Sequence, residues 1–196
     1  ISISSYPPRN PVKVKGIYVS AYVAGTGDMM DRIIEEIRWQ PENFEALYHL
    51  TTDEKLLVSW RALWVCDKLC RQYPDWFAPL REELTGRLVT CKHDGSKRLL
   101  LSILYHAPAE EIPSVELLNF CLDCMLSRHE SIGVQSLAVR MAYHLCKHEP
   151  ELLNELRTIL ESTDTELYST AVKTTVRNTL KKINQKNKKK KQNVFR

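Results

Sequence analysis

The fold is decided by residues 69–77, LCRQYPDWF, because this stretch returns as residues 145–153, LCKHEPELL. The match extends beyond both stretches, pairing Leu80 with Leu156, and the two copies lie 76 residues apart. A further helical pair lies between them, with residues 104–113 at the expected turn. The repeating unit is therefore half the offset, roughly 38 residues, which is typical of stacked helical repeats. The sequence predicts an α-solenoid.

Helical periodicity runs through most of the chain beyond residue 28. Prolines and candidate N-cap residues mark several starts, with Thr52 as the predicted N-cap of the first long helix. Shorter helical segments precede it. The predicted longer helices cover residues 53–72, 75–91, 97–106, 114–127, 131–148, 151–161 and 164–183. No convincing strand follows residue 28.

Residues 1–28 do not share the helical pattern. Prolines at positions 7, 8 and 11 indicate extended chain. Residues 12–23 then alternate and are rich in β-branched side chains, which predicts a strand. A lone strand needs a partner. We therefore interpret residues 1–28 as an irregular or single-strand N-terminal extension, either non-native or disordered.

The helical part of the chain resembles the HEAT and armadillo-like repeat families. The resemblance is carried by residues 53–69 and 131–145, and the segment VSWRALW at 58–64 is close to the second-helix pattern of such repeats. It implies an all-α fold, a right-handed α-α superhelix of about four HEAT-like helical pairs. The expected domains are the extension at 1–28, the solenoid at 29–183 and a basic flexible tail at 184–196.

Charge is distributed unevenly along the chain. The formal net charge is +4, but from Leu167 onward there are ten basic residues and no acidic ones, so residues 1–166 carry −6. Only 6 of 196 residues are glycine and 43% are hydrophobic, which excludes collagen-like and disordered classes. No apolar run reaches the ~20 residues of a membrane span. The sequence predicts an acidic body with a basic tail.

Six cysteines lie in apolar, helix-periodic stretches, which favours reduced, buried thiols and a cytoplasmic protein. Cys121 and Cys124 form a Cys-x-x-Cys with His129 nearby, but residues three apart on a helix simply share a face. His144 and His148, four apart, lack the glutamate of a metalloprotease motif. No nucleophile elbow, phosphate loop or dinucleotide fingerprint occurs. We therefore expect no metal, no cofactor and no catalytic residue.

The most suggestive surface lies on the second helices of the repeats, which line the concave face of such superhelices. Tryptophans one helical turn apart alternate there with basic side chains, a pattern suited to anchoring an acidic or aromatic peptide. Packing between helices is the alternative for both tryptophans. The candidate partner-binding residues are Trp60, Trp64, Lys68, Arg71, Arg98, Arg140, His144 and Lys147. The resulting hypothesis is a non-catalytic HEAT-like scaffold that docks a protein or peptide.

A nucleic-acid-binding protein is the second hypothesis. The basic tail could contact phosphates, with salt-dependent binding. Its candidate residues are Lys181, Lys182, Lys188, Lys189, Lys190 and Lys191. Some HEAT-like proteins that the chain resembles are alkylpurine DNA glycosylases, which would give roles to Trp60, Trp64, Asp67 and Arg140. No motif matches residue by residue, and the acidic body counts against a basic groove.

Overall fold

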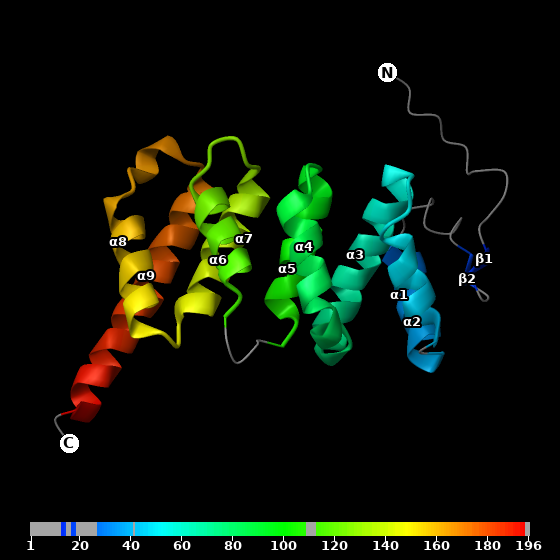
Figure 1. The fold of residues 1–196 in the computed structure, drawn as a ribbon, viewed down its shortest axis with the longest axis horizontal. Coiled ribbons are helices and arrows are strands. Elements are labelled where there is room, and N and C mark those ends of the chain that lie inside the picture. Colours follow the sequence, from blue (N-terminus) through cyan, green and yellow to red (C-terminus); the bar gives the residue numbers. More distant parts are fainter. Residues whose placement is uncertain (1–12, 15–16, 19–26, 41, 109–112, 195–196) are drawn as a thin grey trace. The chain divides into compact units, whose positions relative to one another are not determined.

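The computed structural model describes residues 13–14, 17–18, 27–40, 42–108 and 113–194 (Figure 1). The chain divides into two compact units, Ile1–Pro74 and Asp75–Arg196. The described residues contain nine α-helices. Their only strands are two short ones of two residues each, which precede the first helix. The predicted all-α class is confirmed.

The first unit contains a small hairpin and three helices. Strand β1 (Lys13–Val14) pairs antiparallel with β2 (Ile17–Tyr18), so each short strand has its partner within the extension. Helices α1 (Gly27–Trp39), α2 (Glu42–Leu50) and α3 (Leu56–Gln72) follow, and all three pack on one another. Their core is apolar and includes Ile33, Ile34, Ile37, Leu47, Ala62, Leu63, Val65, Leu69 and Cys70.

Helix α3 begins later than the sequence predicts. Its N-cap is Lys55 and not Thr52. The Thr52 hydroxyl instead donates to the His49 carbonyl at 2.8 Å, so it belongs to the end of α2. Asp53 accepts the Lys55 backbone N–H at 2.8 Å, which makes a turn rather than a first helical residue. The predicted cap is therefore wrong, because these polar side chains bond locally in the α2–α3 connection.

The second unit contains six helices in chain order. After the 3₁₀ segment η2 (Pro74–Leu80) they are α4 (Arg81–Thr90), α5 (Asp94–His106), α6 (Val115–Met125), α7 (Ile132–Cys146), α8 (Pro150–Ser162) and α9 (Thr170–Val194). The predicted helix over 75–91 is thus divided, with Pro79 inside the 3₁₀ part. Helix α5 starts at Asp94 rather than Lys97, because the His93 ring caps it by accepting the Ser96 N–H at 3.1 Å.

The helices form four consecutive pairs, α2–α3, α4–α5, α6–α7 and α8–α9, as expected for about four repeats. Within the second unit, α7 packs against both α5 and α9, and α4 packs against α6. In this unit the second helices α5, α7 and α9 therefore form one layer, and the first helices α4, α6 and α8 form the other. Their common core contains Leu84, Leu88, Leu101, Ile103, Leu117, Val134, Ala138, Leu156, Val176 and Ile183.

Two buried polar contacts fix the connections of the second unit. The buried Arg81 guanidinium donates to the carbonyls of Leu104 and Ala107, at 3.0 and 3.3 Å, and so closes the C-terminus of α5. Lys97 of α5 forms an ion pair with Glu130, 2.6 Å away, just before α7. These contacts join α4 to the end of α5, and α5 to the residues just before α7.

The last helix is longer than the sequence predicts. Helix α9 continues to Val194, whereas the predicted end lay near Ile183. Its buried positions Val172, Val176 and Ile183 face the core, and the lysine-rich part extends the same helix. In the part of the chain described, none of the helices has the length and apolar character to cross a membrane.

Candidate functional site

The predicted tryptophan stripe on α3 is a ladder of three side chains. The rings of Trp60 and Trp64 stack, with centroids 6.5 Å apart and planes inclined by 13°. The ammonium of Lys68 lies 5.7 Å from the Trp64 ring, within cation–π distance. All three residues are half-buried. The spacing of four residues therefore does bring them together, and each keeps part of its surface in solvent.

The two other polar residues predicted on α3 are engaged with one another. Arg71 pairs with Asp67, its Nη2 lying 3.2 Å from Oδ2, and the Asp67 side chain is only 10% exposed. This ion pair gives Asp67 a structural partner on its own helix. It provides no support for the acid role that a glycosylase would require of Asp67.

In the second unit, α5 and α7 meet through an aromatic cluster. The ring of Tyr105 contacts His106 edge-on at 5.3 Å and His144 at 5.8 Å. The Lys147 ammonium lies 3.4 Å from Nδ1 of His144. Burial, with the charges of Lys147, Arg81 and His148, lowers the pKa of His144. The neutral ring therefore predominates at neutral pH.

Helix α9 joins the same surface through Lys182, whose ammonium lies 5.8 Å from the Tyr143 ring. Sequence reasoning included Lys182 only in the tail and missed both tyrosines. A signal was present, since Tyr105-His106 returns as Tyr143-His144 at an offset of 38, half that of the longer repeat. The repeat thus places equivalent pairs on successive second helices.

Two arginines flank this cluster. Arg140 is exposed and lies one turn before His144 on α7, so both share a helix face. Arg98 of α5 is also exposed, and its side chain lies over Gly133 at the start of α7. A Cβ at position 133 would come within 2.8 Å of Arg98 Cδ, so the glycine allows this close approach.

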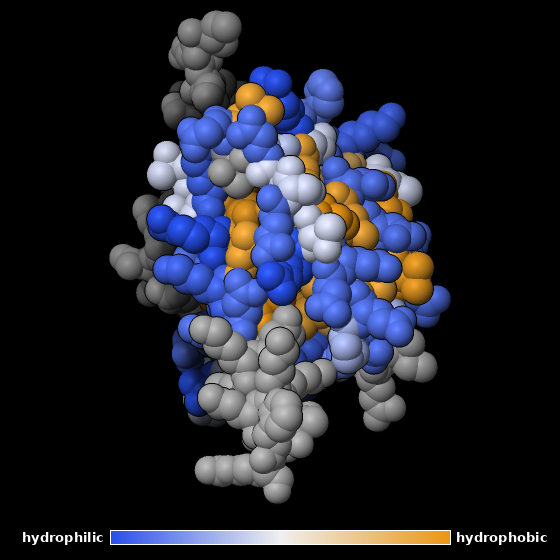
Figure 2. All heavy atoms as spheres, turned by 90° about the vertical axis from the view of Figure 1, so that its left-hand side faces the viewer, coloured by the Kyte–Doolittle hydropathy of each residue, from blue (hydrophilic) through white to orange (hydrophobic). Residues whose placement is uncertain are grey.

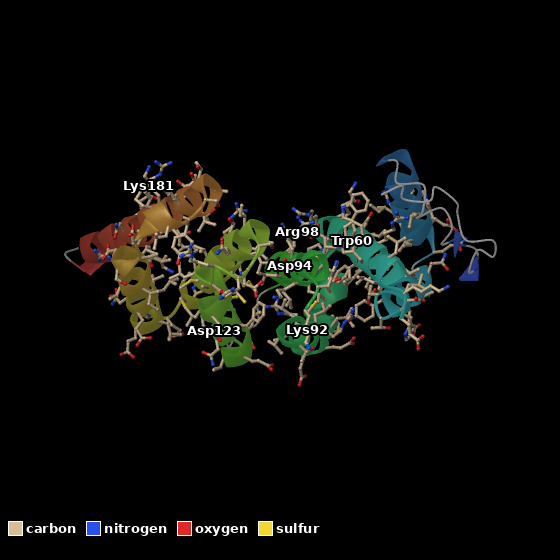
Figure 3. All side chains as sticks on the ribbon, turned by 90° about the horizontal axis from the view of Figure 1, so that it is seen from above. Trp60, Lys92, Asp94, Arg98, Asp123 and Lys181 are labelled. Carbon is tan, nitrogen blue, oxygen red and sulfur yellow. The ribbon has the colours of Figure 1, made fainter. Side chains whose placement is uncertain are left out.

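Charge is separated between the two layers of the second unit. Helices α4, α6 and α8 carry seven acidic residues, all exposed: Glu82, Glu83, Glu116, Asp123, Glu151, Glu155 and Glu161. Helices α5, α7 and α9 carry one, Asp94. Figure 3 shows Arg98 and Lys181 on the side opposite Asp123. We call the exposed cations Arg98, Arg140, Arg177, Lys181 and Lys182 the basic face.

The basic face continues into a groove where α8 ends against α9. The groove has a volume of about 720 Å³, and Leu160 and Leu180 lie in its wall with Glu161, Arg177 and Lys181. Figure 2 looks onto this end and shows hydrophilic residues around narrow hydrophobic strips. The groove thus adds a small apolar component to a cationic surface.

The profile of the HEAT repeat domain matches residues 24–183, most of the chain. The chain belongs to the HEAT repeat family. No curated protein and no solved structure matches the sequence. HEAT repeats typically mediate protein interactions, and the family is generally non-catalytic.

Five of the six cysteines of this HEAT repeat chain are buried. Burial and then the neighbouring Cys124 and Cys146 thiols raise the pKa of Cys121. Burial and then Glu130 raise the pKa of Cys124 to about 11, an effect that Lys97 partly opposes. All six cysteines are free thiols, and Cys91 alone among them is not buried. The described residues hold no group of three or more side chains suited to a metal ion.

The structure describes the side chains of only two of the six candidate tail residues. Lys181 and Lys182 are exposed on α9. Lys188–Lys191 lie within the bounds of the same helix, but their side chains lie outside the described residues. The predicted phosphate contacts of the tail therefore stay a prediction.

Proposed function

We propose that this HEAT repeat chain is a non-catalytic docking module that binds a protein partner on the exposed side of α5, α7 and α9. The observation that carries the proposal is the cluster that links these three helices. Tyr105 contacts His144 across α5 and α7, and Lys182 reaches Tyr143 across α9 and α7. One partner segment lying across this surface would touch three successive repeats.

Rigid aromatic side chains and arginine are the residues that contribute most to protein interfaces. Here Tyr105 and Tyr143 are half-buried and held by neighbours, so little conformational entropy is lost on binding. Arg140 beside them is exposed and has no described ion-pair partner. These features support a docking role for the surface, with Arg98, His144 and Lys147 as further contacts.

The ladder of Trp60, Trp64 and Lys68 is proposed as an additional anchor on α3. The stacked rings present a half-exposed, rigid apolar surface next to an ammonium. Its role is separate from that of the basic face, since each belongs to a different unit of the chain. A substitution that removes the ladder, such as Trp64→Ala, therefore tests its role independently of the basic face.

Site-specific photo-crosslinking tests the docking surface. A photoreactive phenylalanine analogue replaces Asn178, which is exposed on α9 one turn before Lys181 and Lys182 of the basic face, or, as the matched control, the exposed Asp123 on the opposite layer. We expect a discrete protein adduct from position 178, competed away by unlabelled chain, and none from position 123. Equal adducts from both positions, or adducts from neither, would contradict the proposal.

A further inference from the structure

We infer that the partner segment is acidic, and that the basic face of α5, α7 and α9 selects it by charge. This inference rests on the proposed docking function and names the chemistry of its partner. It depends only on residues of the second unit, whose helices pack on one another.

The separation of charge is the first argument. The exposed cations of the basic face lie on helices that hold a single acidic residue, while seven exposed carboxylates occupy the opposite layer. Complementary charge guides encounter and rejects partners of the same sign. An acidic segment is thus attracted to one layer of the unit and repelled by the other.

The second argument is that, among the described residues, the arginines of the basic face are not engaged in ion pairs. Several basic residues of the second unit form ion pairs: Lys97 with Glu130, Lys173 with Glu166 and Arg157 with Glu161. Within the part of the chain described, neither Arg140 nor Arg98 forms an ion pair, and both side chains are exposed. Their guanidinium groups are therefore available to bind carboxylates in the bidentate geometry that arginine favours.

The ring contacts favour a protein over a nucleic acid. Single-stranded nucleic acids bind by stacking bases on open aromatic faces. The ring of Tyr143 lies against the Lys182 ammonium, and the ring of Tyr105 lies against two histidines. Residues 1–166 also carry a net charge of −6, which disfavours the binding of a long polyanion such as a nucleic acid. A short acidic segment can contact the basic layer alone and avoid the acidic one.

The groove between α8 and α9 gives the segment a place for an apolar side chain. Leu180 is half-buried in its wall, next to the exposed Arg177 and Lys181. A segment in which carboxylates alternate with a leucine or phenylalanine matches this combination. Polyglutamate alone would satisfy the cations but not the groove.

Fluorescence anisotropy with the full chain tests the inference. The probe is a labelled peptide of about 15 residues in which Asp and Glu alternate with Leu and Ser, long enough to cross several helices. Its twin carries Asn and Gln at the acidic positions. A labelled oligothymidine of about 15 nucleotides is the nucleic-acid probe.

Three variants separate the possible binding surfaces. Arg140→Glu reverses one charge of the basic face, and Asp123→Lys reverses one charge of the opposite layer as the matched control. A fourfold variant with Gln at Lys188, Lys189, Lys190 and Lys191 removes the charge of the tail. Circular dichroism confirms that each variant keeps the helical content of the wild-type chain.

We expect the acidic peptide to bind and its uncharged twin to fail. Arg140→Glu should weaken binding by about tenfold, whereas the control and the tail variant should change it little. Binding that is lost in the tail variant but kept in Arg140→Glu would overturn the inference. So would tighter binding of oligothymidine that displaces the peptide, because the face would then be a nucleic-acid surface.

Failure of the inference is distinguishable from failure of the docking proposal. If position 178 gives a protein adduct but the acidic peptide does not bind, the docking surface stands and the acidic partner is excluded. If position 178 gives no adduct and the peptide does not bind, both the docking surface and the acidic partner are excluded.

Discussion

The ammonium of Lys97 lies 2.6 Å from Oε1 of Glu130, and both side chains are almost completely withdrawn from solvent, at 11% and 16% exposed. The Cys124 thiol also donates to this Glu130 oxygen, at 3.8 Å. Burial opposes the charge on Lys97, but the hydrogen bond and charge of Glu130 outweigh it, so the pKa of Lys97 lies above its ordinary value of 10.5. The pair joins α5 to the start of α7 and thereby supports the basic face.

We predict that removing one member of this pair is more harmful than removing both. Lys97→Met leaves the Glu130 carboxylate buried without its cation and should cost about 3 kcal/mol of unfolding free energy. The double variant Lys97→Met, Glu130→Met removes both charges and should recover most of that loss. Urea unfolding measures each value, and a double variant as unstable as the sum of the single ones would contradict the prediction.

We predict that His144 makes the fold less stable in mild acid. Its pKa is lowered from 6.5 by burial and by nearby positive charge, so the unfolded chain takes up the proton first as the pH falls. The stabilisation by the neutral ring is present above the ordinary pKa and is lost as the pH falls toward the folded-state value.

Unfolding free energies compared at about pH 7.5 and about pH 5.5 measure this effect. His144→Gln should lose less stability between these values than the wild-type chain does. The exposed His129, replaced by Gln, provides the matched control for the loss of a histidine. An identical pH dependence for His144→Gln and wild type would show that the ring does not carry this linkage.

We predict that one thiol of the native chain reacts ahead of the others. Cys91 is half-exposed and the other five cysteines are buried. Burial and then Glu155 raise the pKa of Cys146 to about 11, so little of its reactive thiolate forms near pH 8. Ellman's reagent should therefore label one group rapidly in native protein and all six in urea, and Cys91→Ser should abolish the rapid phase. Rapid labelling that persists in Cys91→Ser would mean that a buried cysteine is accessible.

We predict that Trp64 contributes to partner binding more than an exposed tryptophan does. Trp64→Ala removes the middle of the ladder and should reduce the amount of partner protein that the full chain retains in a pull-down by about tenfold. Trp39, which is 77% exposed on α1, is the matched control within the same unit. If Trp39→Ala and Trp64→Ala reduce recovery equally, or if neither does, the ladder has no specific role.

Much of the architecture could be predicted from the repeat at residues 69–77 and 145–153, because an offset of whole repeats sets the helix positions. The helix boundaries were less predictable. Thr52 has the right side chain for an N-cap, but its hydroxyl bonds to the previous helix. The Asp94-Gly95 pair has turn character, yet the ring of His93 caps the helix that begins there. Both outcomes depend on local geometry that composition does not encode.

The site could be predicted only in part. The spacing of Trp60, Trp64 and Lys68 was sufficient to place them on one ladder, since the contacts lie within one helix. The separation of charge was hidden, because the sum of −6 over residues 1–166 leaves out Arg177, Lys181 and Lys182 and does not distinguish one helix from the next. Only the packing of alternate helices shows that the acidic residues of the second unit gather on α4, α6 and α8.

The most direct test of the central claim is an NMR titration of the isotope-labelled full chain with the acidic peptide. We expect the amide shift changes to gather on α5, α7 and α9, around Arg98, Arg140 and Lys182, and to leave α4 and α6 unchanged. Changes centred on the acidic layer, or confined to the lysine-rich end of α9, would contradict it.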